Sequence, residues 1–300
     1  MHQLPFAQPG RFWRGNLHTH STRSDGAYAV EEVCRRYRAA GYDFLALTDH
    51  FLAKYNYPIT DTTAYRTADF TTILGAELHT DRIEVGEMWH ILAVGLPADF
   101  AIPPEDESAA HLAQRALAAG AYVAVAHPAW YSLTERDIEK LGMVDAIEIF
   151  NGIAFDHNDH ADSWQIADIM LGRGQRYTIC ATDDFHGTGA RYDFRRGWVW
   201  VKSASLEPRA LLAALKAGHY YSSTGPEIYD IQLFPGDKLL VHCSPANRVL
   251  CTGKGSRAVA VQGNGETQFE LKLNKFDSPY GRVTVRGADG SRAWSNPIWF

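Results

Sequence analysis

Residues 15–26 bring two histidines and a carboxylate close together in the sequence. His18 and His20 are separated by one residue, and Asp25 follows shortly afterwards. Because residues i and i+2 of an extended chain point to the same face, both imidazoles can bind one metal ion from one side. A single His-x-His pair is weak evidence, since many such pairs are ordinary surface or core histidines. The rest of the chain must therefore decide whether this segment belongs to a metal site.

Further residues of metal-ligating types follow short apolar segments elsewhere in the chain. Each segment is typical of a buried strand, and the polar residue stands at its end or just past it. These residues are His50, Glu77, His127, Asp184 and His186, and His90 lies within another apolar run at 88–94. Because the carboxyl ends of parallel strands meet at one face of a barrel, we expect these side chains to converge on one metal site.

Helical and strand-like patterns alternate from about residue 29 to residue 223. Helices are predicted near 29–40, 108–119, 134–141, 162–171 and 207–217, between apolar strands at 44–47, 72–76, 88–94, 122–126, 146–150, 177–181, 198–201 and 220–223. Residues 51–70 are expected to form a loop with one helical turn, and residues 78–87 an excursion between strands. The alternation is typical of an α/β fold with parallel strands and helical crossovers.

The pattern changes near Gly225 to short alternating runs separated by Gly, Asn and Pro. Such runs occur at 231–234, 258–261, 269–273 and 282–285. They predict a small, sandwich-like all-β domain over residues 226–300, after a barrel domain over residues 1–225. The apolar stretch 294–300 is expected to dock onto the barrel.

Composition narrows the functional classes. The net charge is −6 and no long basic run is present, so a surface for duplex nucleic acid is not expected. We expect neither export nor a membrane span, because the chain has no signal-peptide pattern and no apolar run of about 20 residues. The cysteines Cys34, Cys180, Cys243 and Cys251 lack Cys-x-x-Cys spacing, which favours the cytoplasm over a disulfide framework. No pattern specifies an oligomeric state.

Six motifs give the chain a resemblance to a known family. They are Asn-Leu-His-Thr-His at 16–20 with Ser-Asp-Gly at 24–26, Thr-Asp-His at 48–50, Gly-Ala-Glu at 75–77, His-Ile-Leu at 90–92, Ala-His-Pro at 126–128 and Asp-Phe-His at 184–186. In this order they closely resemble the PHP (polymerase and histidinol phosphatase) superfamily of metal-dependent phosphoesterases, over roughly residues 12–225. Residues 220–227 and 294–298 resemble the branch that includes carbaryl hydrolase and carries a β appendage.

The resemblance implies a distorted seven-stranded (β/α) barrel that holds up to three metal ions. The first ion would take His18, His20, Glu77 and Asp184, and the second would share Glu77 and add His90 and His127. The third would take Asp25, His50 and His186. Position 183 is also an aspartate, but the Asp-x-His spacing favours Asp184.

The ligand types also predict the chemistry. Nitrogen and carboxylate donors suit two or three zinc, manganese or iron ions, and Glu77 can bridge two of them. Water held between two such ions loses a proton near neutral pH and becomes a nucleophile. We therefore predict in-line hydrolysis of a phosphomonoester or phosphodiester of a small metabolite, without a covalent enzyme intermediate.

Two other functions stay open at this stage. The same centre could hydrolyse a carbamate, ester or amide, because the branch that the chain resembles includes such an activity. A non-catalytic or polymerase-associated binding module is the other alternative, and the filled ligand set counts against it.

Several residues are candidates for supporting roles. Asp49 joins Glu77 and Asp184 as a candidate catalytic residue because it could orient a ligand histidine, although a capping role is equally compatible. Arg191, Arg195 and Arg196 could clamp a phosphate, with a solvated loop as the alternative, and Asn151 could reach the substrate pocket. His79, His157 and His160 fall in predicted loops and could line the substrate pocket, with a surface position as the default interpretation. Trp89, Trp130 and Tyr131 are expected to be packing residues and not a base-stacking platform.

Overall fold

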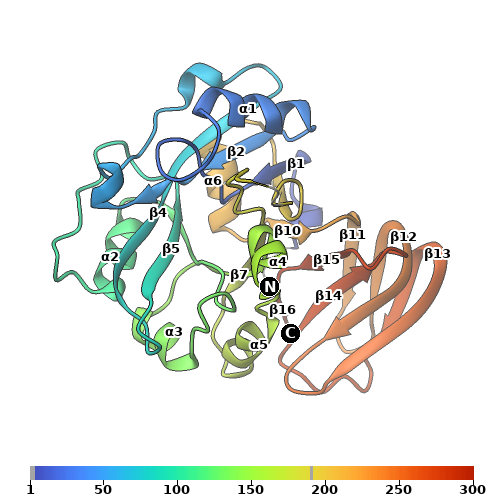
Figure 1. Ribbon diagram of the computed structural model, residues 1–300. Coiled ribbons are helices and arrows are strands. Elements are labelled where there is room, and N and C mark those ends of the chain that lie inside the picture. The colour runs from blue at the N-terminus through green and yellow to red at the C-terminus, as the bar shows by residue number, and fades with distance from the viewer. Residues whose placement is uncertain (1–3, 190–191) are drawn as a thin grey trace.

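The computed structural model describes residues 4–189 and 192–300. Helices and strands alternate up to residue 223, and the described residues after it form strands alone (Figure 1). The predicted α/β class is therefore confirmed. No helix of the described residues is long and apolar enough to cross a membrane.

The six α-helices of the described residues all lie in the first part of the chain. They are α1 (Val30–Ala39), α2 (Ala109–Ala118), α3 (Glu135–Leu141), α4 (Gly152–His157), α5 (Trp164–Gly172) and α6 (Pro208–Lys216). Five of them match the predicted helices. Helix α4 was not predicted, because it starts directly at the end of a strand. The Asn151 side chain caps this helix by accepting a hydrogen bond from Ala154 N (3.0 Å).

Strands up to residue 223 carry the predicted site. They are β1 (Arg11–Asn16), β2 (Phe44–Leu47), β3 (His50–Phe51), β4 (Thr71–Arg82), β5 (Met88–Val94), β6 (Tyr122–Val125), β7 (Ala146–Asn151), β8 (Thr178–Thr182), β9 (Trp198–Ser203) and β10 (Tyr220–Ser223). The pairs β1–β2, β2–β4, β6–β7 and β7–β8 are parallel. The ends of these strands therefore point to one side of the sheet.

The expected excursion at 78–87 is wrong. β4 continues to Arg82 and turns back directly into β5, which makes this pair antiparallel. Polar residues such as His79 and Asp81 interrupt the apolar pattern, so the sequence does not indicate that the strand continues. His79 is nevertheless buried in the structure, against the site. Residues 51–70 form the expected loop, with two short 3₁₀ turns, η2 (Ala53–Tyr55) and η3 (Thr63–Tyr65), in place of one helical turn.

The paired strands up to residue 223 form a path whose two ends approach each other. This path runs β10-β9-β1-β2-β4-β5-β6-β7-β8. Side chains link β8 to β10, since the Ser222 hydroxyl donates to Ile179 O (3.2 Å) and the Tyr220 hydroxyl donates to Thr178 Oγ1 (2.9 Å). Within the described residues the strand pairings do not form a closed ring, so the seven-stranded barrel stays a prediction.

The last part of the chain forms β11 (Ile228–Phe234), β12 (Lys238–Thr252), β13 (Ala258–Lys272), β14 (Tyr280–Arg286), β15 (Arg292–Ser295) and β16 (Ile298–Trp299). Figure 1 shows β11 to β14 as a lobe beside the helices. β15 pairs with β10 and so continues the main sheet into this lobe. A domain boundary at residue 225 therefore stays a prediction.

Residues 294–300 dock onto the first part of the chain. Trp294 is buried and packs beside Trp164 and Phe150, at ring-centroid distances of 6.2 and 6.3 Å. The Asn296 side chain accepts a hydrogen bond from Ile179 N (2.9 Å) and donates to Gly218 O (3.0 Å). One amide side chain thus ties the end of the chain to β8 and to the turn before β10.

The first prediction concerns this amide. Replacing Asn296 by alanine leaves the N–H of Ile179 without its partner, which should lower the free energy of unfolding by about 2 kcal/mol. Urea unfolding followed by circular dichroism measures the change. Asn264→Ala, at an exposed position of β13, is the matched control and should change the stability by less than about 0.5 kcal/mol. Equal effects of the two substitutions would contradict the role of Asn296.

Candidate metal centre

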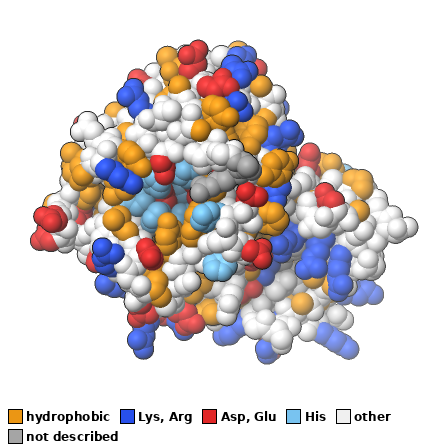
Figure 2. All heavy atoms as spheres, in the orientation of Figure 1, with side chains coloured by type: hydrophobic (Ala, Val, Ile, Leu, Met, Phe, Trp, Pro, Cys, Tyr) orange, Lys and Arg blue, Asp and Glu red, His pale blue; other side chains and the backbone are white. Residues whose placement is uncertain are grey.

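The nine predicted ligands meet at one place. The structure groups His20, Asp25, His50 and His186; His18, His127 and Asp184; His18, His20 and Glu77; and Glu77 and His90 with His50 and His79. Within each group one ligand atom of every residue lies within 4.8 Å of the others. In Figure 2 histidine side chains gather at one place on the visible face, together with acidic and hydrophobic side chains.

Glu77, on β4, lies at the centre of this cluster, and its side chain is 1% exposed. Its Oε1 lies 2.7 Å from His90 Nδ1 and 3.1 Å from His127 Nε2, and its Oε2 lies 2.6 Å from His50 Nδ1. Burial opposes ionisation, but charges on His90, His50 and His18 hold the pKa of Glu77 well below its usual value. Glu77 is therefore a carboxylate with imidazoles on two sides.

Asp184, which follows β8, points into the cluster, whereas Asp183 does not. Asp184 Oδ1 lies 3.0 Å from His20 Nε2 and 3.3 Å from His18 Nε2. Asp183 accepts hydrogen bonds from the Tyr37 hydroxyl (2.7 Å) and from the backbone N–H groups of residues 195–197. Burial raises the pKa of Asp183 to about 6, although these donors oppose the shift. The geometry thus favours Asp184 as the ligand.

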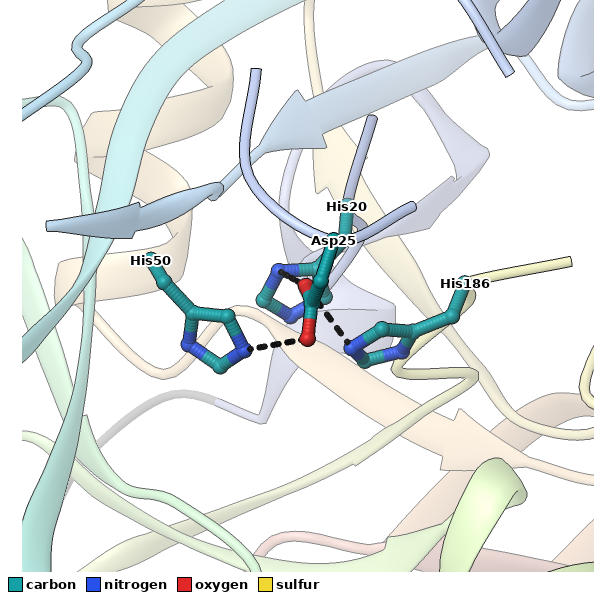
Figure 3. A group of neighbouring side chains, drawn as sticks. All are labelled: His20, Asp25, His50 and His186. Atoms are coloured by element: carbon teal, nitrogen blue, oxygen red, sulfur yellow. Dashed lines mark ion pairs between the residues drawn. The ribbon is translucent and has the colours of Figure 1, made fainter. Parts of the chain in front are cut away.

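Figure 3 shows the outer group, in which Asp25 lies among three imidazoles. Its Oδ2 is 3.3 Å from His50 Nε2, and its Oδ1 is 3.4 Å from His186 Nε2 and 3.8 Å from His20 Nδ1. The Asp25 side chain is 41% exposed, unlike Glu77 and Asp184. This group therefore lies on the side of the cluster that is open to solvent.

A divalent cation fits the cluster. His18 Nε2, His20 Nε2, Glu77 Oε2 and Asp184 Oδ1 are buried side-chain atoms without a hydrogen bond. Buried polar atoms without partners are costly and rare in folded proteins. Asp184 Oδ1 lies 3.3 Å from His18 Nε2 and 3.0 Å from His20 Nε2, and His20 Nε2 lies 3.6 Å from Glu77 Oε2. Cations held among these atoms would satisfy the polar groups that the protein leaves unpaired.

Glu148, on β7, supports the site and was missed in the sequence. It is fully buried and lies 3.1 Å from His18 Nδ1, and it accepts hydrogen bonds from His127 N (2.6 Å) and from the Asn151 amide (3.0 Å). A carboxylate on the second nitrogen of a ligand histidine fixes the orientation of the ring. The sequence feature that could have identified Glu148 is its position as a single acidic residue within the apolar strand Ala-Ile-Glu-Ile-Phe.

Asn151 and Asp49 lie close to the candidate ligands and form hydrogen bonds beside them. The Asn151 amide donates to both Glu148 and Asp184 (3.1 Å), so its N–H groups are used by the protein. Asp49 accepts hydrogen bonds from the backbone N–H of Ser21 (2.7 Å) and from the Ser24 hydroxyl (2.7 Å). Asp49 thus shapes the loop that carries Asp25, and no direct contact between Asp49 and a ligand histidine is recorded among the described residues.

Of the three candidate arginines, the structure describes Arg195 and Arg196. Arg191 lies outside the described residues. Arg195 is exposed, and its backbone N–H donates to Asp183 (3.0 Å). The guanidinium of Arg196 lies over the rings of Phe155 (4.5 Å) and Tyr192 (4.9 Å). A phosphate-binding role for these residues therefore stays a prediction.

Aromatic side chains border the cluster. Tyr131 and Trp130 are half-buried and stack on each other, and the Tyr131 ring lies 4.6 Å from that of His90. Tyr55 is also half-buried and stacks on His50 at a ring-centroid distance of 6.1 Å.

The other residues expected to pack or to lie at the surface have different surroundings. Trp89 is buried in the core, as expected for a packing residue. His160 is exposed, and His157 packs against Trp130. The interpretation of His79 as a surface residue is wrong, because its side chain is buried.

Buried imidazoles and carboxylates at strand ends are typical of metal-dependent hydrolases. Comparisons with known proteins agree with this geometry. Residues 16–162 match the model of the PHP domain family. Residues 16–162 of the chain are therefore similar to a PHP domain. No curated protein gives a significant match.

Two solved structures illustrate the likeness. The first is a two-domain protein from Bacteroides vulgatus that contains a predicted PHP-like metal-dependent phosphoesterase; the identity is 16%, the TM-score is 0.53, and the alignment covers 99% of this chain and 98% of that one. The second is an amidohydrolase from Chromobacterium violaceum with bound sulfate, with 18% identity, a TM-score of 0.44 and coverage of 59% of this chain and 89% of that one. The first shows that the fold is shared along nearly the whole chain.

The second prediction tests the role of Glu148. Glu148→Gln replaces an acceptor oxygen by an N–H₂ group, so the His18 ring loses its fixed orientation and metal affinity should fall by about 10–100-fold. Competition with a chromophoric chelator measures the affinity. Glu105→Gln, in an exposed loop, is the control. Unchanged affinity in a folded Glu148→Gln protein would show that Glu148 does not orient a ligand.

Proposed function

We propose that this protein is a phosphoesterase that hydrolyses a phosphomonoester or phosphodiester of a small metabolite. The observation that carries the proposal is Glu77, a buried carboxylate whose Oε1 faces His90 and His127, while its Oε2 lies 3.6 Å from His20 Nε2. A carboxylate in this position can bridge two ions, which is the arrangement that suits phosphoryl transfer to water.

The ligand groups support a centre of two or three ions. His18, His20, Glu77 and Asp184 would hold the first, Glu77, His90 and His127 the second, and Asp25, His50 and His186 the third. Mixed imidazole and carboxylate donors favour zinc, manganese or iron. Bound there, such ions would lower the pKa of a water molecule to near neutrality and offset charge on the phosphoryl oxygens.

The protein's own residues hold this centre rigid. Glu148 and Asn151 orient His18 and Asp184, and Asp49 holds the loop that carries Asp25. Asp25 lies on the open side, so we place the entry of the substrate there. The half-buried Tyr131 beside His90 offers an apolar wall for the leaving group.

The proposal covers the remaining parts of the chain as well. All candidate ligands lie between residues 18 and 186, so we assign catalysis to a domain of residues 1–225 and a stabilising role to residues 226–300. The expected partner is a small phosphorylated molecule and not duplex nucleic acid, given the net charge of −6. Four buried, unpaired cysteines support a cytoplasmic location.

A second candidate is hydrolysis of a carbamate, ester or amide at the same centre. One observation favours it: within the described residues, the recorded side-chain contacts of the nine ligands include no lysine or arginine. A neutral substrate needs no cationic clamp, whereas a phosphate commonly binds one.

The third prediction concerns metal content. The purified protein should contain two or three transition-metal ions per chain, and removal with a chelator should abolish hydrolysis until zinc, manganese or iron is restored. Elemental analysis and assays with p-nitrophenyl phosphate, bis-p-nitrophenyl phosphate and 1-naphthyl methylcarbamate test both points. Less than one ion per chain with no gain on reconstitution would reject the centre, and preference for the carbamate would select the second candidate.

The fourth prediction separates two ligands. Glu77→Ala should lower kcat/KM by at least about 100-fold, or about 2.7 kcal/mol, because Glu77 is proposed to bridge the pair of ions that activates water. His50→Ala should lower it by only about tenfold, because its Nε2 faces the outer group around Asp25. If both variants keep their metals and His50→Ala is the more damaging, the nucleophile belongs elsewhere.

A further inference from the structure

His79 lies inside the metal centre although it is not one of the nine predicted ligands. It is on β4, two residues after Glu77, so both side chains point to the same face of the strand. Strand pairing places Glu77 opposite His50 of β3, and His79 opposite His90 of β5. The His79 side chain is 1% exposed. Three adjacent strands thus deliver four metal-type side chains to one point.

The distances bring the His79 ring into the ligand cluster. Its Nε2 lies 2.8 Å from His50 Nδ1 and 3.6 Å from Glu77 Oε2. Its ring is nearly perpendicular to that of His90, with the centroids 4.3 Å apart. One atom from each of these four residues lies within 4.8 Å of the others, a spacing that allows them to share an ion.

A purely structural role explains His79 less well. His50 Nδ1 already lies 2.6 Å from Glu77 Oε2, so a hydrogen bond from His50 has a stronger acceptor than an imidazole nitrogen. His79 Nδ1 is buried and has no hydrogen-bond partner. Burying an imidazole without a strong hydrogen bond costs free energy of folding. A cation bound to one of its nitrogens would offset this cost.

We propose that His79 is a tenth metal ligand, which binds through Nε2 the same ion as Glu77 and His90. This inference rests on the proposed metal centre but not on its substrate. With His127, whose Nε2 lies 3.1 Å from Glu77 Oε1, the ion gains a fourth protein ligand where the motifs supplied three. Zinc can also be five-coordinate, so four protein ligands still leave a position for water.

The direct test is a crystal structure of the wild-type holoprotein, with anomalous scattering measured at the zinc and manganese edges. An ion should lie about 2.0–2.1 Å from His79 Nε2. If every bound ion lies more than about 3 Å from that atom, the inference fails while the metal centre stands. If no ion is bound at all, the metal centre fails as well. Neither outcome depends on an assay of hydrolysis.

A variant provides the second test. His79→Gln keeps most of the side-chain volume and a hydrogen-bonding group but removes the imidazole ligand. It should lose about one ion per chain on dialysis against a chelator, with at least about tenfold weaker affinity for that ion. His160→Gln, at an exposed loop position, is the matched control and should keep all its ions. Thermal unfolding of the metal-free proteins checks that both fold.

Full retention of metal by a folded His79→Gln protein, with unchanged affinity, would overturn the inference. If the variant does not fold, the ion positions in the wild-type crystal decide, because they require no substitution. Loss of one ion in the variant and an ion bonded to Nε2 in the wild type together would establish the ligand.

Discussion

The structure depends on the burial of one carboxylate, Glu77, among histidines. An isolated ionised carboxylate in a protein interior costs several kcal/mol unless it is paired. Here β3, β4 and β5 supply the pairing, because their register places His50 and His90 beside Glu77 at 2.6 and 2.7 Å. The site therefore needs the β4–β5 hairpin as much as it needs the ends of the parallel strands.

Other buried acids hold the ligands in a second layer around Glu77. Glu148 faces His18, Asp49 fixes the turn after His20 through Ser21, and Asp183 binds three backbone N–H groups of the loop after β8. Each of these carboxylates accepts several hydrogen bonds, so each stabilises a loop whose shape sets a ligand. Their substitution would disturb the centre without removing a ligand from it.

The nine candidate ligands were recognisable in the sequence because each stands at or near a strand, where the sequence pattern is clear. The places of His79 and Glu148 beside them were not recognisable. Periodicity indicates that a strand exists, but it does not give the register that places His79 opposite His90, and an acid within an apolar strand does not reveal its partner. α4 was missed for a similar reason, because its start depends on the cap supplied by Asn151. The arginines were chosen by proximity in sequence, which carries no information on where a long side chain points.

The C-terminal strands can affect the centre without contributing a ligand. Asn296 binds the backbone of Ile179 in β8, and Asp184 and His186 follow β8 in the chain. Arg282 of β14 binds Asp168 of α5 (2.8 Å) and lies over Trp164, which adds a second attachment on the same side. β8 ends the path of paired strands, so among the described residues one of its edges has no strand paired through the backbone and is held by side-chain bonds from β10 and Asn296. The position of Asp184 at the end of β8 therefore depends on residues more than a hundred positions later in the chain.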